Sequence, residues 1–242
     1  MYDILAKCYD SFQDVDYHAF VDFYEAVFQK HGLTPKLVLD LGCGTGNVTI
    51  PMAERGYEMI GLDASEDMLH LASEKAKQAG QEILFLHQDM TEFELYGTVD
   101  AMVCALDGIN YLTGDHDVVS MLKLLHCYLN PGGIFIFDVN TPYKFKEILD
   151  GNTFVYEDED AFCVWENSLE GDICYFDLTF FLQNTDGSYS RQEEYQEERV
   201  YTTEEIKGMI ADAGLTCLGV YDNLSFDAPR EDSERLFFVV KR

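Results

Sequence analysis

Three alternating glycines in the stretch VLDLGCGTGN (38–47) are the residues that point most directly to a bound ligand. Gly42, Gly44 and Gly46 follow a short apolar run and precede a helical stretch, and because glycine has no Cβ the backbone can turn sharply and approach a ligand there. A turn made only for packing is the simpler alternative. The dinucleotide fingerprint G-x-G-x-x-G would need its third glycine at Asn47, so the spacing argues against a nicotinamide dehydrogenase.

The same stretch, read as DLGCGTGN (40–47), resembles motif I of the class I S-adenosylmethionine-dependent methyltransferases. The resemblance extends over 36–150 and 201–242, with four motifs in the family's order. It implies that the loop residues Gly42, Cys43 and Gly44 wrap the methionine part of the cofactor. It also implies that Asp40 helps to hold the cofactor's amino group.

Two carboxylates stand at the ends of the next expected strands. Asp63 follows the glycine loop by about 20 residues, where an acidic side chain can accept both ribose hydroxyls. It could instead cap the helix that follows, although a serine two positions later already supplies a cap. The resemblance places Ala64 and Met68 beside the adenine, and Asp89 and Met90 at its exocyclic amine and a ring nitrogen. For the last two, a plain turn at the end of the strand is the alternative.

The stretch ALDGINYL (105–112) follows the expected fourth strand, at the sheet edge where open α/β folds bind their ligands. The resemblance implies that Leu106 packs on the cofactor and offers its carbonyl to the amino group. Asp107 and Asn110 would then face the transferred methyl group or its acceptor. Asp138, at the end of the fifth strand, is expected near the rim in a mainly structural stretch.

An N-terminal segment, residues 1–35, is expected to form a helical lid. Its YD…DY pattern is similar to the glycine N-methyltransferase-like branch of the family, in which such a segment covers the cofactor. Tyr9 and Tyr17 are the candidates for closing the pocket. The alternative is that both are aromatic core residues of an amphipathic helix.

A candidate for substrate binding lies in the run SYSRQEEYQEERVY (188–201). Period-two alternation puts Tyr189, Arg191, Tyr195, Arg199 and Tyr201 on one face of a strand. If that face covers the cofactor, Arg199 could clamp a substrate carboxylate through two hydrogen bonds. Ion pairs of Arg199 with neighbouring glutamates are the alternative.

Short apolar runs that alternate with helical patterns must position these residues. Such alternation implies βαβ crossovers and a parallel sheet. We therefore predict an α/β fold with a Rossmann-like, mostly parallel seven-stranded sheet and helices on both faces. A helix over 115–129 with an aspartate cap, a turn at NPGG (130–133) and a helix capped by Thr203 belong to this pattern.

Residues 151–200 interrupt the alternation. They contain strand-like runs with turn signals at Glu170-Gly171 and Asp186-Gly187, and no long helix separates the runs. We expect an inserted antiparallel β-hairpin subdomain over the active site, between the two parts of the cofactor-binding domain (36–150 and 201–242). Its apolar edges could pair across a homodimer.

The composition limits the partners. The chain has 16 basic and 45 acidic residues in 242, a net charge of −29, which makes nucleic acid an unlikely partner because phosphate binding rests on lysine and arginine. The seven cysteines show no metal-ligand spacing, so no metal is expected. No apolar run is long enough to span a bilayer and no secretory signal opens the chain, so we expect a cytoplasmic protein without membrane contact.

The predicted function is S-adenosylmethionine-dependent methylation of a small molecule by in-line methyl transfer. The acceptor atom stays open among an amine, a carboxylate, a hydroxyl and a carbon. An RNA or protein methyltransferase is one alternative, although it would need a basic approach surface. A non-catalytic module that binds the cofactor but has no substrate cavity is another.

Overall fold

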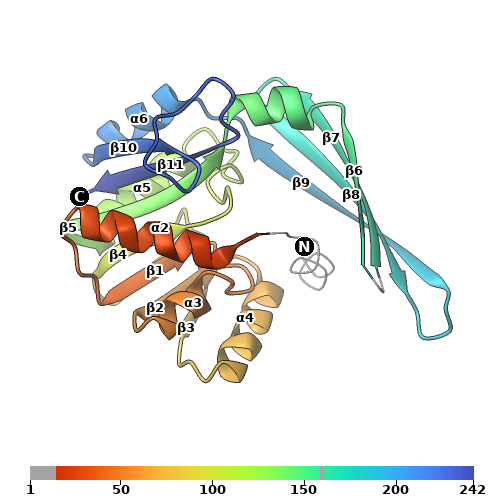
Figure 1. The fold of residues 1–242 in the computed structure, drawn as a ribbon, viewed down its shortest axis with the longest axis horizontal. Coiled ribbons are helices and arrows are strands. Elements are labelled where there is room, and N and C mark those ends of the chain that lie inside the picture. Colours follow the sequence, from red (N-terminus) through yellow and green to blue (C-terminus); the bar gives the residue numbers. More distant parts are fainter. Residues whose placement is uncertain (1–14, 159–160) are drawn as a thin grey trace.

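Two β-sheets, with helices around the larger one, make up the fold (Figure 1). The computed structural model describes residues 15–158 and 161–242. The larger sheet has seven strands in the order β10-β11-β5-β4-β1-β2-β3, and only β11 runs antiparallel to its neighbours. The predicted Rossmann-like sheet is confirmed. Its strands are β1 (Leu37–Leu41), β2 (Glu58–Asp63), β3 (Leu84–His87), β4 (Val99–Cys104), β5 (Leu129–Asn140), β10 (Thr216–Asp222) and β11 (Arg235–Lys241).

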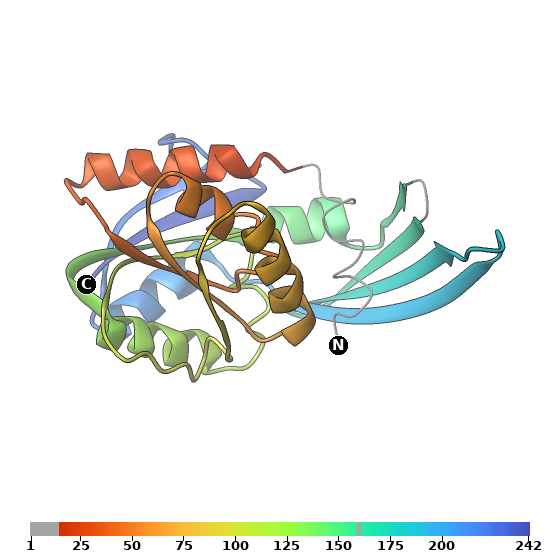
Figure 2. The ribbon, with the colours of Figure 1, turned by 90° about the horizontal axis from the view of Figure 1, so that it is seen from below.

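Helices cover both faces of this sheet (Figure 2). On one face lie α2 (Tyr17–Lys30) and α3 (Thr49–Glu54), and on the other lie α5 (Asp117–Tyr128) and α6 (Thr203–Asp212). A further helix, α4 (Glu66–Gln78), packs beside β2 and β3. Each face thus has its own apolar core, which fixes the sheet between two layers. Within the described ranges, none of the helices is long and apolar enough to cross a membrane.

The order of the strands creates a crevice at one edge of the sheet. The chain runs outward from β1 through β2 to β3, and then returns so that β4 pairs with the other side of β1. The connection after β1 therefore runs to one side, toward β2, and the connection after β4 runs to the other side, toward β5. Open α/β sheets bind ligands outside the carboxyl ends of the strands at such a point.

The second sheet is antiparallel and projects from the end of the larger one (Figure 1). A short π-helix, η1 (Lys144–Leu149), links it to β5 and packs against it through Phe145 and Leu149. Gly171 and Gly187 occupy the turns from β7 to β8 and from β8 to β9 with positive φ angles of 67° and 83°, as such turns require. The strands are β6 (Thr153–Glu157), β7 (Ala161–Glu170), β8 (Ile173–Gln183) and β9 (Tyr189–Arg199), paired in this order.

Several local expectations were wrong. Helix α5 begins at Asp117 after His116, which makes no side-chain cap, and Asp115 forms an ion pair instead. Thr202 rather than Thr203 caps α6, in a reciprocal capping box with Glu205. The predicted turn at NPGG is part of β5, and neither β6 nor η1 was predicted. Helix ends are often misplaced by one or two residues in such predictions. The start of β5 and the presence of β6 depend on pairing with other strands, which local propensity does not report.

Candidate active site

A cavity of about 270 Å³ opens at the carboxyl ends of β1, β2 and β4. It brings together most of the residues that the motifs singled out for the cofactor. Those that line it are Tyr17, Asp40, Gly42, Cys43, Gly44, Asp63, Ala64, Met68, Asp89, Met90 and Leu106. Residues that the sequence did not single out complete the lining, among them Thr45, Asn47, Val48, Leu62, Ala105, Gly108, Tyr111 and Leu112. Tyr9 lies outside the described residues.

The glycine loop forms one wall of this cavity, and its glycines have different roles. Gly42, Gly44 and Gly46 all have positive φ angles, of 69°, 53° and 81°. A Cβ on Gly42 would lie 3.1 Å from the Met90 side chain, and one on Gly46 would lie 3.2 Å from Ile50. A Cβ on Gly44 would have no neighbour within 4 Å. Packing therefore explains the first and third glycines, whereas Gly44 keeps its backbone open toward the cavity.

Asp40 places a buried carboxylate at the base of the cavity. Its Oδ2 accepts a hydrogen bond of 2.6 Å from the Thr49 hydroxyl. Its Oδ1 is buried and has no hydrogen-bond partner among the described residues. Burial raises the pKa of Asp40 to about 7, although the bond from Thr49 opposes the shift. A buried carboxylate oxygen without a partner is costly, so this atom is suited to a cationic ligand group.

Two more carboxylates stand at neighbouring strand ends. Asp63 accepts hydrogen bonds from the backbone N–H of Gly44 and of Ser65, each at 2.8 Å, and so ties the glycine loop to the start of α4. Burial raises the pKa of Asp63, while these backbone bonds lower it. Asp89 accepts two bonds of 2.7 Å from Thr91. Each carboxylate keeps lone pairs for further donors, such as ribose hydroxyls or an exocyclic amine.

The turn after β4 holds a strained backbone at the inner end of the cavity. Leu106 and Asp107 have φ angles of 56° and 54°, a region that side chains other than glycine rarely adopt. The buried Asp138 carboxylate accepts both of their backbone N–H groups at 2.9 Å. Arg235 pairs with Asp138 and also with Asp107, at 2.6 Å for the latter. Asp138, expected only near the rim, is therefore the support of this turn.

A second cavity, of about 340 Å³, adjoins the first and shares Leu106 and Tyr111 with it. It lies between the turn after β4, η1 and the inner face of the second sheet. Its polar lining comprises Asp107, Asn140, Lys144, Gln196, Glu198 and Arg235. Its apolar lining includes Val15, Ile148, Leu149, Phe154, Tyr156, Cys163, Trp165, Phe176, Leu178 and Phe180.

The predicted substrate face of β9 was wrong. Tyr189 and Tyr195 are 54% and 65% exposed, whereas the opposite face, with Glu194, Gln196 and Glu198, is buried. The register explains the difference, because Gln196 and Glu198 pair with Phe176 and Cys174 of β8, whose apolar face turns inward. An error of one residue in the assumed alternation exchanges the inward and outward faces of a strand.

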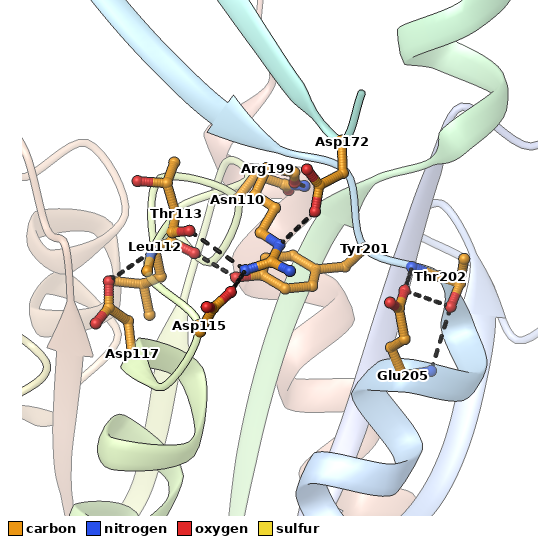
Figure 3. A network of polar contacts seen from close by, with 11 residues as sticks. Asn110, Leu112, Thr113, Asp115, Asp117, Asp172, Arg199, Tyr201, Thr202 and Glu205 are labelled. Carbon is orange, nitrogen blue, oxygen red and sulfur yellow. Dashed lines mark hydrogen bonds and ion pairs between the residues drawn. The ribbon is translucent and has the colours of Figure 1, made fainter. Parts of the chain in front are cut away.

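Arg199 does not form the predicted carboxylate clamp. Its guanidinium group pairs with Asp115 at 3.1 Å and with Asp172 at 3.0 Å, and it lines neither cavity (Figure 3). The predicted glutamate partners are replaced by two aspartates from loops on either side. Arg199 thus connects the end of β9 to the loop before α5 and to the turn between β7 and β8.

Asn110 also serves the fold, because its side chain binds backbone groups of two strands. Its amide nitrogen donates to the Arg199 carbonyl at 2.9 Å, and its amide oxygen accepts from the Asn140 N–H at 3.0 Å. The side chain is fully buried and lines neither cavity. Asp107, in contrast, lines the second cavity.

Comparison with known proteins identifies the family. A methyltransferase domain family matches residues 38–133. The protein YqeM of Bacillus subtilis (strain 168), named as a methyltransferase, is 35% identical over 246 residues, which cover 100% of this chain and 97% of YqeM. A crystal structure of an S-adenosylmethionine-dependent methyltransferase from Clostridium acetobutylicum ATCC 824 is 32% identical, with a TM-score of 0.88 over 99% of this chain and 95% of that one.

The chain belongs to the S-adenosylmethionine-dependent methyltransferases. More distant members of this family include a dTDP-3-amino-3,6-dideoxy-alpha-D-glucopyranose N,N-dimethyltransferase of Streptomyces fradiae, 24% identical over 83% of this chain and 78% of its own. The expected cofactor, S-adenosylmethionine, is confirmed, in agreement with the glycine spacing that argued against a nicotinamide dehydrogenase.

The first cavity of this methyltransferase is chemically suited to S-adenosylmethionine. The Asp40 oxygen that has no hydrogen-bond partner within the described part of the chain matches a ligand ammonium group, and the open backbone at Gly44 matches a closely approaching ligand. Asp63 and Asp89 line the same cavity and offer acceptors for hydroxyl and amine donors. The residues present therefore fit the charge and the donors of this cofactor.

The sequence-based reading missed the second cavity. Its signal was present as an alternation of apolar residues in ICYFDLTFF (173–181), which puts Phe176, Leu178 and Phe180 on one face. The hairpin at Asp186-Gly187 sets the register, so residues 194, 196 and 198 must share that face. Combining both observations would have favoured Glu198 over Arg199.

Proposed function

We propose that this methyltransferase methylates a small organic molecule that binds in the second cavity. One observation carries the proposal: a partly enclosed, largely apolar cavity of about 340 Å³ adjoins the cofactor cavity and shares Leu106 and Tyr111 with it. Such a space suits a small ligand. The inserted sheet supplies most of its apolar wall, and we assign this subdomain to acceptor binding.

The residues of the chain would act mainly by alignment. When bound, S-adenosylmethionine supplies a methyl group already activated on a positively charged sulfur, and it leaves little chemistry to the protein. We assign Asp40 to the amino group of the cofactor, Asp63 to its ribose and Asp89 to its adenine. The turn at Leu106–Asp107 separates the two cavities, so an acceptor atom positioned there can attack in line with the leaving sulfur.

The apolar residues of the second cavity would exclude water from this step. Tyr111 donates to Gln196 at 3.0 Å, which holds the base of the inserted sheet against the cofactor domain. We propose Tyr17, at the start of α2 and in the lining of the first cavity, as a residue that covers the cofactor.

A small acceptor is favoured over RNA or protein by two observations. The net charge of −29 opposes a polyanion, and the second cavity is too confined for a folded macromolecule. The names of several relatives refer to small acceptors, including an amino sugar and glycine or sarcosine.

The test uses cofactor with a labelled methyl group and a cell extract divided by ultrafiltration into metabolites and macromolecules. We expect the label to enter the metabolite fraction and to depend on the enzyme. Label found only in RNA or protein would overturn the proposal.

A variant tests the position of the acceptor. Leu178→Trp places a large ring inside the second cavity, beside the cross-strand neighbour Trp165. We expect this variant to have lost the methylation of metabolites. Its affinity for S-adenosylmethionine, measured by calorimetry, should stay within twofold of the wild type. The matched control is Thr179→Trp, one residue further on β8 and on the opposite face. Unchanged methylation in Leu178→Trp would argue against acceptor binding in this cavity.

A further inference from the structure

A buried pair of carboxyl groups stands in the wall of the second cavity. Glu198 is 2% exposed, and its Oε2 accepts a hydrogen bond of 3.2 Å from the amide of Asn140. Its other neighbour is the carboxyl group of Asp107, with which it shares a hydrogen bond. Two carboxyl groups that share a hydrogen bond ionise one after the other, because the charge on the first opposes ionisation of the second. Glu198 has no role in the cofactor cavity.

The surrounding charges decide which group keeps the proton. Asp107 from the turn after β4, Lys144 from η1, Arg235 from β11 and Cys174 from β8 face Glu198. Burial acts to raise the pKa of Asp107, but the positive charges of Arg235 and Lys144 hold it below its ordinary value. Burial and the charge of Asp107 raise the pKa of Glu198 well above its ordinary range. Of the two groups, Glu198 is therefore the one that ionises last and that, once ionised, holds an incoming proton more tightly.

The positive charges around the pair are already engaged. Both terminal nitrogens of Arg235 pair with carboxylates, one with Asp107 and one with Asp138. Lys144 donates to the Asn140 side chain at 2.8 Å. An anionic ligand would therefore meet an acidic pair and little unpaired positive charge. A cation gains a carboxylate partner as soon as Glu198 ionises.

Aromatic rings line the inward face of the same sheet, further along its strands. Trp165 lies in contact with Phe154, Tyr156 and Phe176, with ring centroids 6.4, 6.0 and 5.3 Å away. The Trp165 indole nitrogen is buried and has no hydrogen-bond partner within residues 15–158 and 161–242. This wall suits an apolar body, and its ring faces favour a nearby cation.

We infer that the methyl acceptor is a primary or secondary amine on an apolar body, and that Glu198 accepts the proton of its ammonium form. The inference rests on the proposed function, because it assigns chemistry to the second cavity. The ammonium group loses one proton to the ionised Glu198, which exposes the nitrogen lone pair. The nitrogen then forms the new C–N bond, the C–S bond breaks, and its electron pair stays on the sulfur.

The products of this step balance. The positive charge passes from the sulfonium to the methylated ammonium, and Glu198 holds the proton that the amine gave up. Release of that proton to solvent, after the product leaves, returns Glu198 to the ionised form that binds the next ammonium. The same chemistry disfavours acceptors that carry a diphosphate, because the described lining offers no free cluster of positive charge.

The first experiment identifies the methylated atom. The enzyme is incubated with a metabolite extract and with S-adenosylmethionine whose methyl carbon is carbon-13, and the product is examined by carbon–proton correlation NMR. A methyl group on nitrogen is expected. A methyl group on oxygen or carbon would overturn the inference while the proposed function stands. If no metabolite acquires the label, the proposed function itself fails.

The second experiment separates proton acceptance from structural support. In Glu198→Gln we expect kcat/KM for the amine identified above to fall about 100-fold near neutral pH, as for a lost general base. The adjacent, outward-facing Glu197→Gln makes the same change from carboxyl to amide and should stay within twofold of the wild type. Cofactor affinity, measured by calorimetry, should be unchanged in both variants.

The pH profile distinguishes a proton acceptor from a residue that only supports the fold. The wild-type kcat/KM should rise through the pKa of Glu198 and then level off. That of Glu198→Gln should keep rising until the pH reaches the pKa of the amine itself, because only the free base then reacts. Parallel profiles in the two enzymes, or equal kcat/KM in Glu198→Gln and Glu197→Gln, would overturn the role of Glu198.

Discussion

Five aspartate or glutamate side chains at the two cavities have different partners, and the partners decide what each can do. Asp138 is held by Arg235 and two backbone N–H groups, so it supports a turn. Asp63 binds two backbone N–H groups yet still faces the cofactor cavity. Asp40 has a buried oxygen without a partner among the described residues, and Glu198 shares a hydrogen bond with Asp107. Residue type alone does not separate these roles.

The pKa of Asp40, about 7, predicts a pH-dependent affinity for S-adenosylmethionine. The cofactor's ammonium group pairs with the ionised carboxylate, so below pH 7 binding must first remove a proton. We expect the dissociation constant to level off above about pH 8 and to increase as the pH falls, approaching about tenfold per pH unit well below 7. Calorimetry over this range measures it. Asp40→Asn should bind weakly at every pH, and a flat wild-type profile below 7 would contradict the assignment.

Asp63→Ala should weaken cofactor binding strongly. The change removes the carboxylate assigned to the ribose and also frees the Gly44 N–H, so two supports of the cavity are lost. Because hydrogen bonds to a charged group contribute about 1.5–3 kcal/mol, we expect affinity to fall by roughly 10- to 100-fold or more. Calorimetry with S-adenosylhomocysteine measures the loss. Wild-type affinity in this variant would count against the site.

At the scale of elements, the turn after β4 depends on a neighbouring strand. Leu106 and Asp107 keep positive φ angles because Asp138, on β5, binds both of their N–H groups. Strained backbone of this kind persists only where the surroundings hold it. The turn forms the boundary between the two cavities. Asp138 on β5 therefore fixes a wall of the site that the chain after β4 supplies.

Asp138→Asn should destabilise the fold. An amide cannot accept both backbone N–H groups as a carboxylate does, and it leaves buried Arg235 with one carboxylate instead of two. We expect the free energy of unfolding in urea to fall by about 3 kcal/mol, as for other broken buried pairs. The control is Asp100→Asn, where a more exposed carboxylate also accepts two backbone N–H groups but has no arginine, and where about 1 kcal/mol is expected. Equal losses would show that Arg235 contributes nothing.

The elements themselves were largely predictable. The apolar runs and their intervening helices follow local periodicity, and every predicted strand of the larger sheet is present. The ends of these strands carry Asp40, Asp63 and Asp89, which is why the cofactor cavity could be assembled from motifs. The second sheet was expected as hairpins, but its inward face was not, because Arg199 and Glu198 lie one residue apart in a strand that is polar on both faces.

At the scale of the whole molecule, the net charge of −29 is spread over a chain of 242 residues. Like charges at this density repel one another and oppose the compact state. Salt screens such repulsion over distances of about 10 Å at 0.1 M. We therefore expect the charge to lower stability at low ionic strength without changing the fold.

The thermal midpoint Tm should rise as sodium chloride is increased from about 0.01 M to 0.15 M, a range over which the screening length shortens from roughly 30 to 8 Å. Differential scanning calorimetry at constant pH measures it. Choline chloride should give the same rise, because screening does not depend on the identity of the cation. A flat or falling Tm would show that the acidic surface carries little net repulsion.

The sequence by itself determined the parallel sheet, the glycine loop and the carboxylates at the carboxyl ends of β1, β2 and β3, since each of these depends on residues close together in the chain. Only the tertiary structure decided what faces the methyl acceptor. The second cavity joins the turn after β4, η1, β11 and the inner face of β6 to β9, and no local pattern reports which face of a two-sided polar strand turns inward. Pairing with β8 decides it, because the apolar residues of β8 must be buried and the register carries Glu198 in with them.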